Sequence, residues 1–173
     1  DAVVRNTQPR DDGVAGRGIQ FQQGGKGTVN RVVLDGNHSH GLAVSDQGSV
    51  VSARELVSQN TISSNGAEPA FGMQVSDGAQ LDLQFGLFRQ NAGVGVAVSG
   101  EGTLVKMEDT MIAATKTRTD GIWGRGFTLY QGAQAELSRV MIAQNRNVGC
   151  VVQDAGSVLT ADDIFIVDQH IKN

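Results

Sequence analysis

Two charged stretches of this 173-residue chain carry side chains that could bind a ligand. The first contains Asp12 and Arg17, and the second contains Arg118, Asp120, Trp123 and Arg125. An exposed indole beside arginine and aspartate suits a sugar or a peptide, because the ring offers an apolar face with a polar edge. We therefore expect these six residues to form a ligand-binding surface. In the alternative, Val14, Phe71, Ile122 and Trp123 fold back to cover a neighbouring sheet.

We expect the other polar clusters of the sequence to have structural roles and not catalytic or metal-binding ones. Asp11–Asp12 and Asp162–Asp163 resemble paired catalytic acids, but they fall at different phases of the repeat described below. His38 and His40 lack a third ligand at the neighbouring repeat positions, so we expect a surface turn there. The sequence predicts no catalytic residue, no metal site and no cofactor.

A column of charged residues recurs along the chain and has two interpretations. Glu55, Asp109 and Asp163 follow one another at 54-residue intervals and could line a calcium site, since calcium prefers several oxygen ligands. The preceding positions carry both signs, which favours a solvated ladder of ion pairs instead. These preceding positions are Arg31, Arg54, Phe85, Glu108, Arg139 and Asp162.

All of these groups must be positioned by a repeat. Six segments begin with glycine followed by an apolar, any, apolar pattern, at spacings of 23, 31, 23, 31 and 23 residues. A short and a long unit together make a 54-residue double repeat. The opening glycines are Gly18, Gly41, Gly72, Gly95, Gly126 and Gly149.

Each unit has the pattern of β-strands. Apolar residues alternate with small or polar ones, which is typical of a strand with one buried face. A second glycine and two further apolar clusters follow in each unit, so three short strands and three turns are expected per coil. We predict an all-β parallel solenoid of about six to seven coils, with 1–173 as a single domain. The predicted internal column contains Phe21, Val44, Val75, Val98, Leu129 and Val152.

Asparagines give a further phase marker. Residues of this type stand 19 positions after four opening glycines, and one more stands at the corresponding place before the first full coil. Asparagine tolerates left-handed backbone and caps turns, and stacked copies could form a hydrogen-bonded ladder. The predicted structural positions are Asn6, Asn37, Asn60, Asn91 and Asn145.

The units GLAVSDQGSVVSARELVSQN, GMQVSDGAQLDLQFGLFRQN and GVAVSGEGTLVKMED resemble right-handed parallel β-helix repeats of the pectin-lyase-like superfamily. The double repeat also resembles long glycine-rich proteins that bacteria export or display on the cell surface. The resemblance implies a right-handed coil, but it implies no single activity, because this fold carries lyases, hydrolases, adhesins and inert stalks.

The eight extra residues of the long units fall within 7–17, 61–71 and 115–125, and insertions on one face of a solenoid often mark its binding surface. We therefore expect a noncatalytic scaffold or binding segment of an exported bacterial surface protein, with polysaccharide or protein as partner at these loops. The alternative is a polysaccharide lyase or hydrolase that acts through the same loops.

Composition narrows the remaining classes. Fourteen basic and 18 acidic residues give a net charge of −4, which provides no basic footprint for nucleic acid. No apolar stretch is long enough to span a membrane. Because neither end of the chain carries a polar cap, we also expect a segment of a longer solenoid, or ends that associate with another copy.

Overall fold

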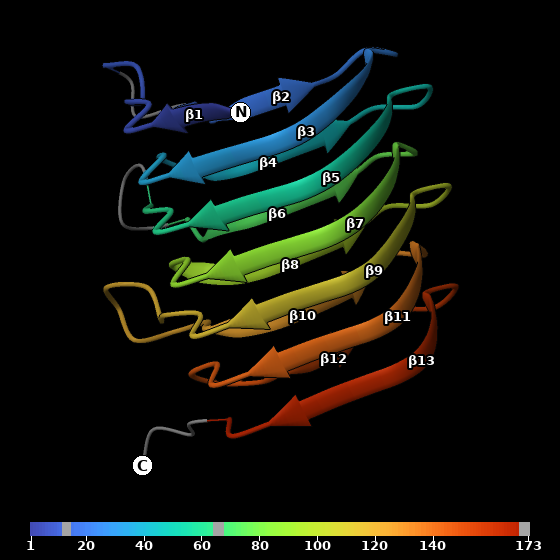
Figure 1. Ribbon diagram of the computed structural model, residues 1–173. Helices are drawn as coiled ribbons and strands as arrows, with labels where there is room; N and C mark the ends of the chain where they lie inside the picture. The colour runs from blue at the N-terminus through green and yellow to red at the C-terminus, as the bar shows by residue number, and fades with distance from the viewer. Residues whose placement is uncertain (12–14, 64–67, 170–173) are drawn as a thin grey trace.

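The computed structural model describes residues 1–11, 15–63 and 68–169, and these residues form two stacked parallel β-sheets (Figure 1). The seven-stranded sheet has the order β1-β3-β5-β7-β9-β11-β13, and the six-stranded sheet has the order β2-β4-β6-β8-β10-β12. Their bounds are β1 Ala2–Arg5, β3 Lys26–Asp35, β5 Val50–Gln59, β7 Gln80–Arg89, β9 Leu104–Ala113, β11 Gln134–Ala143 and β13 Val158–Val167, then β2 Ile19–Phe21, β4 His40–Ser45, β6 Ala70–Ser76, β8 Gly93–Ser99, β10 Arg125–Tyr130 and β12 Cys150–Val152.

The chain alternates between the two sheets, so each coil contributes one strand to each. All the strand pairs are parallel, and every strand pairs with the strand two elements away in the sequence. This arrangement confirms the predicted parallel β-solenoid. No helix occurs among the described residues, and hence none that could cross a membrane.

The second and third predicted strands of each coil are one continuous ten-residue strand. A single residue in the middle of each strand has a φ between 50° and 61°, and this residue bends the strand around the core. Left-handed backbone breaks the regular pleat, so the strand turns a corner without leaving the sheet. The bend column consists of Arg31, Glu55, Phe85, Asp109, Arg139 and Asp163.

The interior is a stack of apolar columns that runs the length of the coil. The predicted column from Phe21 to Val152 is confirmed, because its members pair in register across all six strands of the smaller sheet. Val75 and Val98 are fully buried, whereas Val152 in the last coil is exposed. On the opposite wall, Leu83 and Ile142 point into the same core.

A one-residue offset distinguishes alternate coils. Phe21 pairs with Val44, a separation of 44 − 21 = 23, but Lys26 of the same coil pairs with Val50, a separation of 50 − 26 = 24. The turn between the two sheets is therefore one residue longer after β4 than after β2. The alternation is 23 and 31 on the smaller sheet but 24 and 30 on the larger one. Positions counted from the opening glycine thus slip by one residue in every second coil.

This offset corrects the predicted asparagine series, which mixes two columns. Asn37, Asn91 and Asn145 are fully buried and recur in every second coil. Asn6 and Asn60 instead lie one position earlier in their coils, where the backbone is left-handed, with φ of 54° and 56°. The five asparagines are therefore not stacked as one ladder.

Three of the opening glycines, Gly18, Gly72 and Gly126, lie directly against the buried asparagines. A Cβ atom on Gly72 would lie 2.5 Å from the Asn91 side-chain nitrogen and 2.5 Å from the Gly95 carbonyl oxygen. Real Cβ atoms do not approach other atoms so closely, so only glycine, which has no Cβ, fits this position. The glycine that marks each repeat thus makes room for the next coil.

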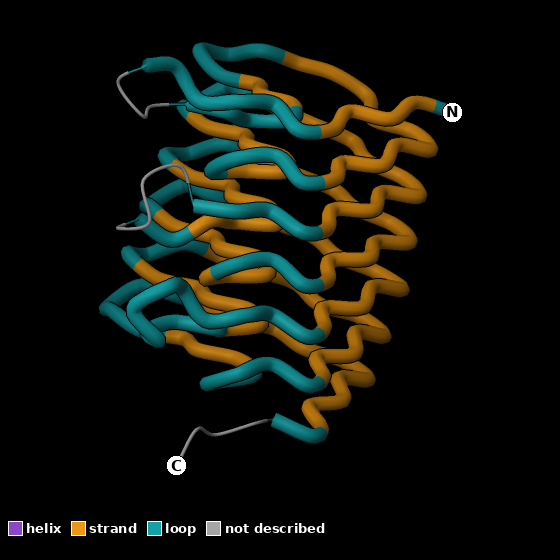
Figure 2. Tube along the Cα trace, turned by 90° about the vertical axis from the view of Figure 1, so that its left-hand side faces the viewer, coloured by secondary structure: helices purple, strands orange, loops and turns teal. Residues whose placement is uncertain are grey.

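The long connections lie where the eight extra residues predict them. They join β1 to β2, β5 to β6 and β9 to β10, and they project from the same side of the coil (Figures 1 and 2). Loops two coils apart are separated by about 10 Å, twice the spacing between neighbouring strands. The outer face of the six-stranded sheet lies next to them.

Candidate functional site

A groove of about 280 Å³ lies on the outer face of the six-stranded sheet, beside the second and third long loops. One wall comes from the end of loop 60–69, and the other comes from Trp123 at the end of loop 114–124. The described residues that line it are Glu68, Pro69, Phe71, Val94, Ala97, Trp123, Arg125, Thr128, Tyr130 and Gln153.

The groove is built from the outward positions of three neighbouring strands. Phe71, Val94 and Arg125 pair in register across β6, β8 and β10, so they form one row. Ala97 and Thr128 form a second row, three residues further along the strands. Ala97 has a small side chain at the base of the groove, and the larger residues around it form the walls.

Trp123 and Arg125 are held together at the edge of the groove. The guanidinium carbon of Arg125 lies 4.6 Å from the centre of the Trp123 ring, which is a cation–π contact. Trp123 and Gly124 have φ of 71° and 92°, so two successive left-handed residues turn the loop sharply back into β10. A Cβ on Gly124 would lie 2.8 Å from the Arg146 Cβ, which leaves little room for any other residue there.

Two polar atoms of the groove have no hydrogen-bond partner among the described residues. They are Nε of Arg125 and the hydroxyl oxygen of Thr128, a residue that is only 3% exposed. Buried polar groups in folded proteins are normally satisfied by protein atoms or by a bound molecule. The protein covers both atoms, so they are buried polar groups at the base of the groove whose hydrogen-bonding capacity the described residues leave unused.

The structure separates the six predicted ligand-binding residues. Trp123 and Arg125 line the groove, whereas Arg118 and Asp120 are joined in an ion pair of 2.6 Å within the loop. Asp120 also accepts a hydrogen bond of 2.9 Å from the Ile122 backbone, so this pair shapes the loop. Asp12 lies outside the described residues. Arg17 precedes β2 and is not among the described residues that line the groove.

The sequence pattern did not predict Thr128, Tyr130 and Gln153 as groove residues, because they lie on strands or directly after one and not in the long loops. The alternation in GFTLY was a sufficient signal, since it makes Phe127 and Leu129 inward and Thr128 and Tyr130 outward. Phe71, which was predicted as a loop residue, belongs to β6 and is half-buried on the outer face of the sheet.

The prediction of a surface turn at His38 and His40 is wrong for His40, which begins β4 and is 7% exposed. Its ring stacks on Phe71 with the centres 5.0 Å apart, and its nitrogens lie 2.6 Å from the Ser39 hydroxyl and 2.5 Å from the Gln74 side-chain oxygen. Because that oxygen only accepts, Nε2 carries the proton. Burial lowers the pKa of His40 to about 4, which outweighs the opposing effect of the Gln74 hydrogen bond, and the nearby charge of Arg17 lowers it further.

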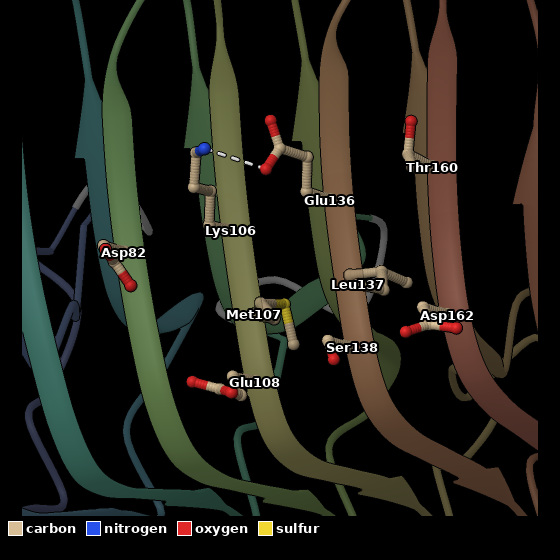
Figure 3. Close-up of a pocket in the computed structure, with 9 residues that line it drawn as sticks. All are labelled: Asp82, Lys106, Met107, Glu108, Glu136, Leu137, Ser138, Thr160 and Asp162. Carbon is tan, nitrogen blue, oxygen red and sulfur yellow. Dashed lines mark ion pairs between the residues drawn. The ribbon is translucent and has the colours of Figure 1, made fainter.

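A second hollow lies on the larger sheet and is lined mainly by charged groups (Figure 3). Asp82, Lys106, Glu136 and Thr160 form one row across neighbouring strands, and Lys106 is joined to Glu136 by an ion pair of 2.8 Å. Glu108, Ser138 and Asp162 form the next row, in which the small serine creates the hollow. No group of three or more His, Cys, Asp or Glu residues suited to a metal ion is found in the described part of the chain.

The charged column also follows the one-residue offset, so its predicted members divide between two structural columns. Arg139, in the bend column, binds Asp109 of the preceding coil at 2.6 Å and also contacts Glu108. Asp162 instead pairs in register with Ser138, so the predicted alternation of Glu108, Arg139 and Asp162 is wrong at its last member. The hydrogen bond from Arg139 holds the pKa of Asp109 below its usual value.

Two parallel sheets joined coil by coil, with a groove beside loops that recur in every second coil, define a parallel β-helix protein. A model of the right-handed beta helix region matches residues 1–112, so the chain belongs to the right-handed beta helix family. Searches of curated proteins and of solved structures find no match.

Proposed function

We propose that this β-helix is a noncatalytic binding segment of an exported bacterial surface protein and that its groove binds a polysaccharide. The observation that carries the proposal is the composition of the groove. Phe71, Trp123 and Tyr130 supply aromatic surface, and Arg125 and Gln153 supply polar side chains beside it. Aromatic rings beside a few oriented polar groups are the usual means of binding a sugar ring.

The repeated fold supports a display role. Each coil adds about 4.8 Å to a rigid column, so the helix holds its loops at fixed spacing along one side. Resemblance to long glycine-rich proteins of the bacterial surface supports the same setting. In that setting, a linear polymer could lie along several loops at once.

A noncatalytic role is supported by the acids of the groove. Hydrolysis of a glycosidic bond ordinarily requires two carboxyl groups on opposite sides of the bond, roughly 5 to 9.5 Å apart. Among the described residues that line the groove, Glu68 is the one carboxylate. Asp120, the acid predicted in the loop that precedes Trp123, is held by Arg118 and by the backbone of its own loop.

The proposal is tested by titrating the protein with a panel of uronic-acid and neutral polysaccharides in a calorimeter, while new unsaturated and reducing ends are assayed in the same samples. We expect saturable binding to at least one polymer without new chain ends. Trp123→Ala should weaken binding roughly tenfold, because it removes the largest apolar surface of the groove. Ile122→Ala is the matched control, since Ile122 is exposed in the same loop and does not line the groove.

Two results would overturn the proposal. The absence of binding to every polymer would remove the binding role. Chain cleavage that disappears in Arg125→Ala would show instead a lyase or hydrolase that acts through this groove.

A further inference from the structure

An apolar stripe runs along the outer face of the seven-stranded sheet, away from the groove. The position two residues after each bend carries an apolar side chain in all six long strands, and these positions pair in register from strand to strand. The stripe consists of Val33, Val57, Leu87, Met111, Met141 and Phe165. Met111, Met141 and Phe165 are 38%, 41% and 62% exposed.

Such a stripe is unusual on the outer face of a sheet, where polar residues normally alternate with the buried ones. It becomes wider at the last coil, where Val167, two residues after Phe165, is also exposed. Contiguous exposed apolar surface on a folded protein generally marks a contact with another molecule.

The bend column beside the stripe carries charges of alternating sign. From the first to the sixth long strand it contains Arg31, Glu55, Phe85, Asp109, Arg139 and Asp163. The order of charges is therefore positive, negative, aromatic, negative, positive, negative. When this order is set against its own reverse, the first position (Arg31) faces the sixth (Asp163), and the second (Glu55) faces the fifth (Arg139). Both of these pairs combine a positive and a negative charge.

We propose that two copies of this chain pair face to face through the apolar stripe, with their coils stacked in opposite directions. The two-fold axis lies in the interface, parallel to the strands and between β7 and β9. This rotation places Arg31 opposite Asp163 and Glu55 opposite Arg139 of the second copy, each pair occurring twice. Along the stripe, it places Val33 opposite Phe165, Val57 opposite Met141 and Leu87 opposite Met111.

The charges specify this register. A shift by one coil in one direction would place Arg31 opposite Arg139 and Glu55 opposite Asp109. A shift in the other direction would place Glu55 opposite Asp163 and Asp109 opposite its own copy. Like charges face each other in both shifted arrangements, so the apolar stripe alone permits several registers and the bend column selects one.

The two arginines can serve both chains. Arg31 binds Asp1 at 2.9 Å and Arg139 binds Asp109 at 2.6 Å within the chain, but their side chains remain 60% and 47% exposed. A guanidinium group has five N–H donors, so it can keep its own carboxylate and bind a second one across the interface.

The size of the face sets the strength of the contact. Six coils at about 4.8 Å span roughly 24 Å, and one sheet face of this height provides less than the ~800 Å² per partner of a standard interface. We expect a dimer with a Kd on the order of tens to hundreds of micromolar. A two-fold contact of this type closes at two copies, unlike end-to-end stacking.

Sedimentation velocity over a wide range of protein concentrations tests the proposal. The protein should pass from monomer to dimer and should stop there. Met111→Arg and Met141→Arg should each weaken the dimer at least tenfold, because they place a charge in the stripe. Gln80→Arg is the matched control, since Gln80 is exposed on the same sheet before the bend, and it should dimerise like the parent protein.

A charge exchange tests the register separately. Glu55→Arg and Arg139→Glu should each weaken the dimer, and the double variant should restore it, because the opposed pair is then inverted. Circular dichroism of each variant shows whether the helix remains folded. A protein that stays monomeric at all concentrations, an assembly that is unaffected by Met111→Arg, or a double variant as weak as the singles would each overturn the proposal.

Discussion

Asn91 binds Thr61 of the preceding coil through both the backbone and the side chain of the threonine. Its side-chain oxygen accepts hydrogen bonds of 3.1 Å from the Thr61 amide and 3.0 Å from the Thr61 hydroxyl. Its side-chain nitrogen donates to the Ser58 carbonyl at 3.1 Å. Both residues are fully buried, so this amide satisfies three groups that water cannot reach.

The same relationship recurs with the period of the double repeat. Asn37 bonds to Thr7 and Val4, and Asn145 accepts a hydrogen bond from Thr115. Threonine and asparagine therefore alternate along this column. In the coil after Asn145, Gln169 follows the same pattern, since its side-chain oxygen accepts a hydrogen bond from the Asn145 amide and its side-chain nitrogen donates to the Ile142 carbonyl. The two coils of each double repeat differ at this position because one carries the asparagine and the other carries the threonine that the asparagine binds.

Asn91→Ala should destabilise the protein by about 3 kcal/mol, because it leaves a buried amide, a hydroxyl and a carbonyl without partners and each such loss costs about 1–3 kcal/mol. Denaturant unfolding of the variant and the parent measures this difference. Gln90→Ala is the control. Gln90 is exposed, and the corresponding position in the next coil is already occupied by Ala114. An Asn91→Ala variant as stable as Gln90→Ala would contradict the assigned role.

Val98→Asp should cost several kcal/mol, because Val98 is fully buried in the internal column and a carboxylate there would have no partner among the described residues. Val98→Leu tests the same site without charge, and it should be tolerated far better, since the next coil carries Leu129 in the same column. Thermal melts of the two variants compare these effects. If Val98→Asp melts like the parent protein, the assignment of the internal face is wrong.

Stability should decrease between neutral and acidic pH through His40. Its pKa is about 4 in the folded protein, whereas the ordinary value of 6.5 applies to the unfolded chain, so the unfolded chain binds more protons over this interval. The stabilising contribution is complete above pH 6.5 and is lost as the pH falls toward 4. The loss amounts to about 3 kcal/mol, since a pKa difference of one corresponds to about 1.4 kcal/mol. Denaturant unfolding at a series of pH values measures the slope.

His40→Gln should remove this part of the pH dependence, and His38→Gln, two residues away, should retain it because His40 is untouched. Equal slopes for the parent and His40→Gln between pH 4 and 6.5 would show that His40 is not held neutral by burial.

The fold could be predicted from the sequence because glycine spacing and apolar alternation report directly on the coil. The internal column from Phe21 to Val152 follows from the alternation alone. The one-residue offset was present in the sequence, because the second glycine stands alternately six and seven residues after the opening glycine, but positions counted from the opening glycine do not take it into account. Asn60 and Glu108 were therefore placed in the wrong columns.

The candidate site could be predicted only in part. Trp123 and Arg125 were identified by residue type, but the position of Arg17 depends on how many coils separate two loops that look alike in sequence. The apolar stripe was present in pairs such as Leu87–Phe88 and Met141–Ile142, in which one residue points inward and the other points outward. A single sequence does not state which of two adjacent apolar residues faces the core.

Trp123 allows the most direct test of the proposed binding function. It is the single tryptophan of the chain and it lines the groove beside Arg125, so its fluorescence reports on this place alone. Addition of a polysaccharide that binds should change the intensity or wavelength of the Trp123 emission saturably, with the same Kd as calorimetry. Arg125→Ala should weaken binding and so raise that Kd. Binding measured by calorimetry without any change in Trp123 emission would place the ligand elsewhere on the helix and contradict the account.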